Sequence, residues 1–173
     1  MSYLPDPPKA SVLYALEVPP QRRRHQLLFD VCARGTSCPA RLQRRVDGLR
    51  VKHDGTYNSG GYVRQGVTPT DDPRTSPGTL HPLVSVHPET GRPGLYLGRR
   101  RNAYIEGLSL DESDALLDEI WAQATRDSLT WRHQWRVGDL VLWDNRCTMH
   151  RRDAFDPSSA PRDAPHADQG RPR

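Results

Sequence analysis

The chain has few of the residues that mark several classes of protein. Cysteine occurs three times in 173 residues, at Cys32, Cys38 and Cys147, and this spacing matches neither a paired disulfide framework nor a metal knuckle. We therefore expect free thiols in a reducing compartment. No apolar run approaches the roughly 20 residues that cross a membrane, and the start, MSYLPDPPKA, lacks the apolar segment of a signal peptide. These absences predict a cytoplasmic protein with no membrane partner.

Lysine is also scarce, because Lys9 and Lys52 are the two lysines among 25 basic residues. The formal net charge is +4, but no basic face interleaved with aromatic residues accompanies it, which argues against nucleic acid as a partner. Apolar residues make up 35% of the chain, beside 16 Pro and 13 Gly. This length and composition predict one domain with a thin core.

The segment from Thr130 to Pro157 carries the strongest local pattern. Aromatic and apolar residues alternate with arginine and glutamine over 131–137, which is the period of a half-buried strand. Gly138 and Asp139 supply a turn, and the apolar run LVLW that follows predicts a returning buried strand, so we expect a hairpin. The chain then becomes polar and reaches His150 beside two arginines. Periodicity alone would make this histidine a surface or hydrogen-bonded residue.

The remaining elements are predicted from spacing and punctuation. An apolar run bounded by prolines predicts a central strand over Ala10–Val18, and alternation predicts another over Leu80–His87 with a return at Leu95–Leu97. Helical spacing predicts a helix over Pro39–Val51. A second helix opens at the capping box of Ser109 and Glu112 and runs to about Thr125. Its apolar stripe predicts packing on a sheet, with the members Leu116, Leu117, Ile120, Trp121 and Ala124.

Three stretches resemble one known family. WDNRCTMHRRDAFDP resembles the distal-histidine segment of the Fe(II)/2-oxoglutarate dioxygenases of the TauD/TfdA family, and the similarity extends to HPLVSVHPETGRPGLYLGRRRNAYIEGL and SYLPDPPKASVLYALEVPP. The resemblance implies a mainly β (α+β) fold with flanking helices, an incomplete double-stranded β-helix or jelly roll. It also implies His150 as an iron ligand, with Fe(II) and 2-oxoglutarate as cofactors. The partner would be a small, anionic organic substrate, and a homo-oligomer stays open.

The family's other two iron ligands come from a His-x-Asp pair in a context like Trp-His-x-Asp-x-Ser-Tyr. Met1-Ser2-Tyr3 would follow that aspartate directly, so we expect residues 1–158 to form a partial domain without the pair and 159–173 to be a disordered tail. Iron of this class needs two histidines and a carboxylate on one face. His87-Pro88-Glu89 has a His-x-Glu form, but Pro88 and the Thr-Gly that follows predict a turn. His53-Asp54 lacks the intervening residue that would place both side chains on one face.

The resemblance also implies residues for the organic ligands. The loop from His53 to Pro77 would be a lid, with Tyr57, Asn58 and Tyr62 as candidate substrate contacts, although a plain connection is an equal alternative. An arginine about a dozen positions after the distal histidine pairs with 2-oxoglutarate in the family, and Arg162 lies near that spacing. Arg162 is therefore the candidate 2-oxoglutarate ligand.

Two stretches depart from the family in a way that indicates frameshifts. Codons for Ser-Gly-Gly-Asp-Thr, the family's turn at this place, read one base early give Gln-Arg-Arg-Arg-His, which is Gln21–His25. Codons for the family's Met-His-Arg-Thr-Gln-Ile-Lys-Gly read in another frame give Ala164–Gly170. We interpret residues 21–38 and the tail after Ser158 as shifted, which would make Arg162 accidental. Translating the genomic locus in three frames tests this interpretation, and an intact coding sequence for these same residues in a working relative would contradict it.

Two hypotheses about function follow from the sequence. The first is a working 2-oxoglutarate-dependent dioxygenase, an oxidoreductase that hydroxylates a small anionic compound, whose N-terminal part with the His-x-Asp pair comes from a longer chain. The second is a catalytically inactive remnant, a pseudogene product or truncated gene model with the family's sheet but without its metal site. Bound iron with 2-oxoglutarate-dependent uptake of O₂ separates the two.

Overall fold

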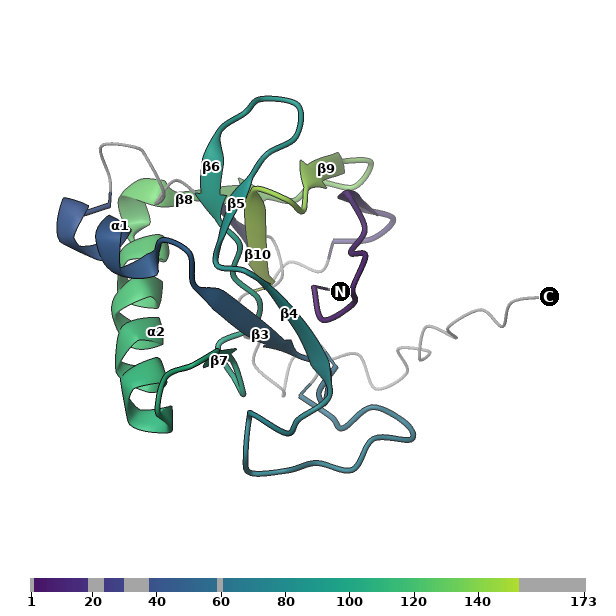
Figure 1. Ribbon diagram of the computed structural model, residues 1–173. Helices are drawn as coiled ribbons and strands as arrows, with labels where there is room; N and C mark the ends of the chain where they lie inside the picture. The colour runs from purple at the N-terminus through teal and green to yellow at the C-terminus, as the bar shows by residue number, and fades with distance from the viewer. Residues whose placement is uncertain (1, 19–23, 30–37, 59–60, 153–173) are drawn as a thin grey trace.

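The computed structural model describes residues 2–18, 24–29, 38–58 and 61–152, in which short antiparallel strands are flanked on one side by two α-helices (Figure 1). The helices are α1 (Ala40–Val46) and α2 (Leu110–Ala124), followed by a 3-10 turn over Asp127–Leu129. The strands are β1 (Ala10–Tyr14), β2 (Arg24–Phe29), β3 (Arg50–Asp54), β4 (Gly78–Pro82), β5 (Val84–Val86), β6 (Pro93–Leu95), β7 (Tyr104–Ile105), β8 (Thr130–Gln134), β9 (Leu140–Asp144) and β10 (Thr148–Arg152). They pair as β1-β9, β10-β2-β8, β4-β3-β7 and β5-β6.

Helix α2 forms as the sequence predicts. Ser109 Oγ accepts a hydrogen bond from the Glu112 backbone N–H at 3.3 Å, and the Glu112 carboxylate accepts one from the Ser109 N–H at 3.0 Å. This reciprocal pair satisfies two of the backbone donors that a helix start leaves open. The predicted stripe faces inward, with four members buried and Trp121 half-buried against the same core.

The main core lies between the helices and the β3-β4-β7 sheet. Helix α1 lies beside α2, where Arg41 and Arg45 both form ion pairs with Glu119 (Figure 1). The buried members of the core all come from one stretch of the chain, and they are Cys38, Leu42, Val46, Val51, Leu83, Leu95, Leu97, Ala103, Ile105, Leu116, Leu117, Ile120 and Ala124. Burial of these apolar side chains is the dominant stabilising term for such a unit.

Helix α1 is shorter than predicted. It ends at Val46, and Gly48 has φ of +74°, a left-handed conformation that glycine adopts without steric cost. The chain reverses there and enters β3 at Arg50, so the predicted extension of the helix to Val51 is wrong. The sequence pattern predicted a longer helix because the apolar residues that lead into β3 continue the helical period by chance.

The predicted hairpin over 131–143 is wrong, although both strands and the turn exist. β8 pairs with β2, whereas β9 pairs with β1, so the two strands enter different sheets. Gly138 does take φ of +90°, but its N–H donates to Ala15 O at 2.8 Å. In return the Ala15 N–H donates to Asp139 O at 2.9 Å. The turn therefore joins the end of β1 and does not close a hairpin.

Strand β1 is not the central strand that its apolar sequence predicts. Within the described residues it pairs with β9 alone, and cross-strand partners in an antiparallel pair point to the same face. One face of this ribbon is therefore apolar and largely open to solvent. It consists of Val12 (53% exposed), Tyr14 (58%), Leu140 (64%) and Leu142 (67%). On the other face Trp143 is buried, at 5% exposed.

The predicted strand over 80–87 is divided in two. Leu83 separates β4 from β5, is fully buried, and donates its N–H to Leu49 O at 2.8 Å. β5 pairs back on β6 across a turn, as expected, with the pairing two residues earlier than predicted.

Cys147 carries a free thiol and Cys38 is buried in the core. In the part of the chain that the structure describes, neither helix combines the length and apolarity needed to cross a bilayer.

Candidate functional site

His150 lies in β10, the strand that follows β9 in the sequence, and β9 carries the buried Trp143. The centroids of the two rings are 4.7 Å apart with an interplanar angle of 52°, while the His150 side chain remains exposed. Its backbone pairs with Leu27 of β2. The sequence placed His150 after the end of a core strand, whereas the structure places it within a strand that the pattern did not predict.

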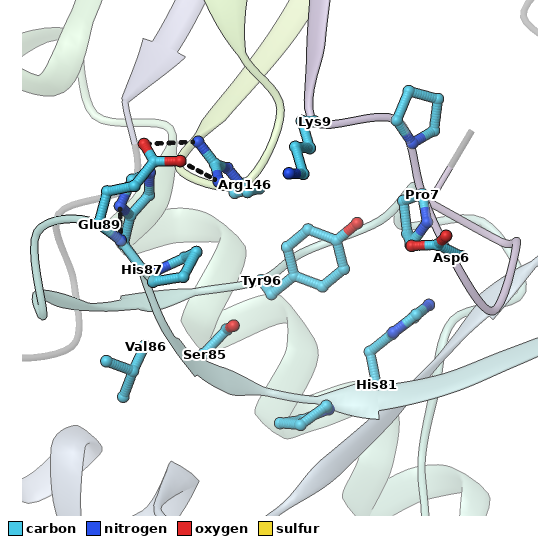
Figure 2. Close-up of a pocket in the computed structure, with 13 residues that line it drawn as sticks. Asp6, Pro7, Lys9, His81, Ser85, Val86, His87, Glu89, Tyr96 and Arg146 are labelled. Carbon is cyan, nitrogen blue, oxygen red and sulfur yellow. Dashed lines mark hydrogen bonds and ion pairs between the residues drawn. The ribbon is translucent and has the colours of Figure 1, made fainter.

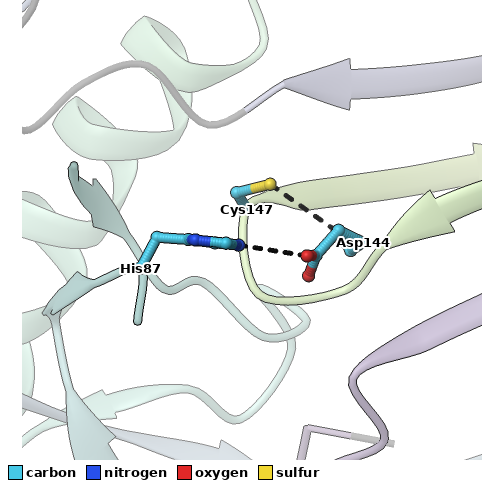
Figure 3. A group of neighbouring side chains, drawn as sticks. All are labelled: His87, Asp144 and Cys147. Atoms are coloured by element: carbon cyan, nitrogen blue, oxygen red, sulfur yellow. Dashed lines mark hydrogen bonds and ion pairs between the residues drawn. The ribbon is translucent and has the colours of Figure 1, made fainter. Parts of the chain in front are cut away.

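The turn between β9 and β10 is fastened to the β5-β6 turn by His87 and Asp144 (Figure 3). His87 Nε2 lies 3.0 Å from Asp144 Oδ2. His87 Nδ1 accepts backbone N–H groups from Glu89 at 3.4 Å and Thr90 at 3.2 Å. Because Nδ1 is an acceptor, the proton of the neutral ring sits on Nε2 and is donated to the carboxylate. The two turns are joined by a hydrogen bond of fixed direction.

Arg146 adds a second link between the same turns. Its guanidinium contacts Glu89 with two bonds of 3.0 and 3.1 Å, shown by the dashed lines in Figure 2. The same guanidinium holds Asp144 through Nη2 at 2.5 Å and Nε at 2.9 Å. Glu89 thus belongs to an ion pair, and HPETG is the connecting turn that the sequence predicts. We call His87, Glu89, Asp144 and Arg146 the turn clamp.

The charges within the turn clamp reinforce one another. Hydrogen bonds from Arg146, opposed by burial and aided by the bond from His87, hold the pKa of Asp144 well below its usual range. Hydrogen bonds from Arg146 likewise lower the pKa of Glu89, and both carboxylates raise the pKa of Arg146. The two carboxylates and the guanidinium therefore stay ionised at neutral pH and hold the polypeptide just before His150.

His87, Asp144 and Cys147 place one ligand atom each within 4.8 Å of one another, which is the spacing of a cation site. The hydrogen bonds that these atoms already form argue against a bound metal ion. The Asp144 oxygens already accept from Arg146 and His87, and a guanidinium at 2.5 Å opposes a second cation electrostatically. His87 and Asp144 therefore hold two turns together. The spacing of residues in the sequence gave no signal for this contact, because His87 lies 57 residues before Asp144.

The fit of the described residues to a mononuclear iron site is partial. The histidine, cysteine and carboxylate group above is the one described cluster with three or more such ligands, and His150 is not in it. A facial triad needs two histidines and one carboxylate. Within the described ranges His150 offers one imidazole, so no reaction step through a metal follows from these residues.

Tyr57 and Asn58 lie at the start of the loop after β3, where the sequence placed candidate substrate contacts. Asn58 accepts the Tyr62 backbone N–H on its side-chain oxygen at 3.0 Å, which folds the loop tightly. Arg101 stacks its guanidinium 3.6 Å from the centroid of the Tyr57 ring. The structure joins these residues to an arginine cluster, and their contact with a substrate stays a prediction. Arg162 and Cys32 lie outside the described residues.

A cavity of about 370 Å³ opens between the N-terminal segment and the β4-β5 region (Figure 2). Tyr96 projects into its centre between Lys9 and His81, and its ring also stacks on His53 at 5.1 Å. Burial raises the pKa of the Tyr96 phenol. The lining includes neither His150 nor Tyr57, so this cavity does not join the two sites that the sequence singled out.

Comparison with known proteins gives the family. The model for "Taurine catabolism dioxygenase TauD, TfdA family" matches residues 1–165. The chain belongs to the TauD/TfdA family. It is 35% identical over 151 residues to the alpha-ketoglutarate-dependent 2,4-dichlorophenoxyacetate dioxygenase of Cupriavidus pinatubonensis, covering 86% of this chain and 51% of the relative. It is 34% identical over 162 residues to the (S)-phenoxypropionate/alpha-ketoglutarate-dioxygenase of Sphingobium herbicidovorans, covering 90% and 55%.

A solved structure gives the architecture. The crystal structure of AAD-2 in complex with Mn(II) and N-oxalylglycine superposes with a TM-score of 0.75 at 32% identity, covering 94% of this chain and 63% of that chain. The jelly-roll fold expected for the TauD/TfdA family is thereby confirmed. The family is one of Fe(II)- and 2-oxoglutarate-dependent dioxygenases. The chain spans about half the length of the curated relatives that it matches.

Replacing Asp144 is expected to loosen the turn clamp. Asp144→Ala removes the acceptor of His87 and of Arg146 and should lower the free energy of unfolding by about 1 to 2 kcal/mol, since hydrogen bonds to charged groups contribute that much. Urea denaturation measures the change. Asp72→Ala is the matched control, because Asp72 pairs with Arg74 within one exposed loop. Equal losses in both variants would contradict a fastening role for Asp144.

Proposed function

We propose that this chain carries one iron ligand, His150, of an Fe(II)- and 2-oxoglutarate-dependent dioxygenase that hydroxylates a small anionic organic substrate. The observation that supports it best is the position of His150, in the segment that resembles the family's distal-histidine motif. There Trp143 supports the ring and the turn clamp fixes the preceding turn. The names of the two phenoxy-acid relatives point to carboxylate substrates.

The second candidate is a catalytically inactive remnant with the same fold. Two observations favour it: among the described residues His150 belongs to no cluster of three ligands, and the β1-β9 ribbon leaves an apolar face exposed. Both candidates make the same statement about the fold and differ in whether iron binds.

The purified chain decides between the candidates. Under argon, Fe(II) is added with 2-oxoglutarate, and bound metal is measured after gel filtration. Uptake of O₂ is then followed on exposure to air. The dioxygenase predicts bound iron and 2-oxoglutarate-dependent uptake, both lost in His150→Ala. His133→Gln is the control, because the His133 imidazole is already bonded to Asp139 at 2.9 Å. Bound iron with uptake in the unaltered chain would contradict the remnant, and retention of both in His150→Ala would contradict the proposed role of His150.

A further inference from the structure

Three arginines converge on the loop that follows β3. Arg99 Nη1 donates to the Tyr57 carbonyl at 2.9 Å and also to the Asn58 carbonyl. The Arg101 guanidinium lies over the Tyr57 ring at 3.6 Å. The Arg64 guanidinium lies over the Tyr3 ring at 4.3 Å. The Arg64 backbone N–H donates to Thr56 O of the same loop at 2.8 Å. All three arginines, Arg64, Arg99 and Arg101, therefore contact residues 56–58 of one loop.

The positive charge of this cluster is not balanced by ion pairs. Within the described residues no carboxylate lies at ion-pair distance from Arg64, Arg99 or Arg101, and the shielded Arg64 Nε has no hydrogen-bond partner there. Arg100 stands between two of them in sequence and differs, because it pairs with Asp114 at 3.0 Å and Asp118 at 2.8 Å. The chain therefore neutralises one of three adjacent arginines and leaves the other two available.

The electrostatics of Arg99 agree with this geometry. Burial and then the charge of Arg64 lower the pKa of Arg99, while the Asp54 carboxylate opposes them. One oxygen of the Asp54 carboxylate, Oδ1, already accepts a hydrogen bond from the Thr56 hydroxyl at 2.6 Å. Two like charges held near each other favour a bound anion, because the anion relieves the repulsion between them.

We propose that Arg64, Arg99 and Arg101 bind the carboxylate of a small organic acid, with the Tyr57 and Tyr62 rings beside it. A guanidinium presents donors in a planar fork that matches a carboxylate, which a lysine cannot do. The Tyr62 side chain is 74% exposed and offers aromatic surface to the rest of the acid. The inference rests on the proposed function in that it supplies the recognition site for the anionic substrate class.

Metal-free binding tests the cluster separately from catalysis. The chain is titrated with phenoxyacetate and with phenoxyacetamide, its uncharged analogue, and binding is followed by calorimetry and by amide chemical shifts. We expect phenoxyacetate to bind at least about tenfold more tightly than phenoxyacetamide, since charged hydrogen bonds contribute on that scale. The shifts should concentrate at residues 55–66 and 97–102. Equal binding of acid and amide would overturn the proposal.

Variants assign the effect to particular arginines. Arg64→Gln combined with Arg99→Gln should weaken phenoxyacetate binding at least about tenfold. Arg100→Gln removes one positive charge from an already paired position and should change binding less than about twofold. Circular dichroism verifies folding, and Arg101→Gln replaces the double variant if the latter unfolds. Equal weakening by Arg100→Gln would mean a diffuse charge effect and would overturn the site. Carboxylate selectivity without iron-dependent O₂ uptake would leave the site standing and contradict the proposed function.

Discussion

Leu117→Ala is expected to lower the free energy of unfolding by about 3 kcal/mol, because it removes the apolar atoms and leaves a cavity in a packed core. Leu117 is fully buried in the stripe of α2 that faces the β3-β4-β7 sheet. Surrounding side chains are held by the helix and the sheet together, so the cavity collapses only in part. Denaturation in urea, followed by circular dichroism, measures the loss as a shift of midpoint at constant slope.

Leu16→Ala is the matched control for Leu117→Ala. The deletion is chemically the same, but Leu16 is 74% exposed and lies outside the core, so its replacement should change stability by less than about 0.5 kcal/mol. Comparable losses for the two leucines would show that the helix stripe is not the main core. A loss at Leu117 below about 1 kcal/mol would lead to the same conclusion.

Stability is expected to fall as the pH drops from about 6.5 to about 4, because His53 resists protonation in the folded chain. Burial, aided by the nearby His81 and opposed by a hydrogen bond to the Tyr96 carbonyl, lowers the pKa of His53 from 6.5 to about 4. The unfolded chain therefore binds a proton that the folded chain excludes in this window. The contribution is fully present above pH 6.5 and decreases by about 3 kcal/mol on passing to pH 4.

His53→Gln tests the origin of this pH dependence. The variant loses packing, so absolute stability falls at every pH, and the informative quantity is the slope of unfolding free energy against pH. Between pH 6.5 and 5 that slope should be less positive in the variant than in the unaltered chain. Parallel slopes would assign the effect to other groups. Restricting the range to above pH 5 keeps most carboxylates ionised.

Local sequence patterns predicted helix α2 correctly but did not predict the burial of His53. The capping box of Ser109 and the apolar stripe are encoded within one turn or a few turns of helix, so a single stretch of sequence contains the whole signal. His53 begins what the sequence presents as a polar loop. The structure buries it at 1% exposed, with Gly98 so close that a Cβ there would lie 2.7 Å from the His53 Cγ. That approach joins residues 45 positions apart, which periodicity does not register.

The resemblance offered residues for the candidate site, but the sequence did not predict the contacts that connect its segments. Resemblance indicated His150, Tyr57 and Asn58 as functional residues. The link from His87 to Asp144, however, depends on two turns from different sheets meeting in space. The β8-β9 hairpin failed for the same reason, because the pattern locates strands and a turn but not their partners. Strand pairing across more than 100 residues is decided by the packing of the whole chain.

Among the described residues, the buried members of the main core all lie between residues 38 and 124, and this has a consequence for synthesis on the ribosome. Chains emerge from the amino end, so the helix layer and the β3-β4-β7 sheet are complete before residue 130 is translated. Strands β1 and β2 are made before this middle segment but pair with β8, β9 and β10, which are made after it. These two strands therefore wait for partners that are made more than 100 residues later, whereas the helix layer has its partners nearby in the chain.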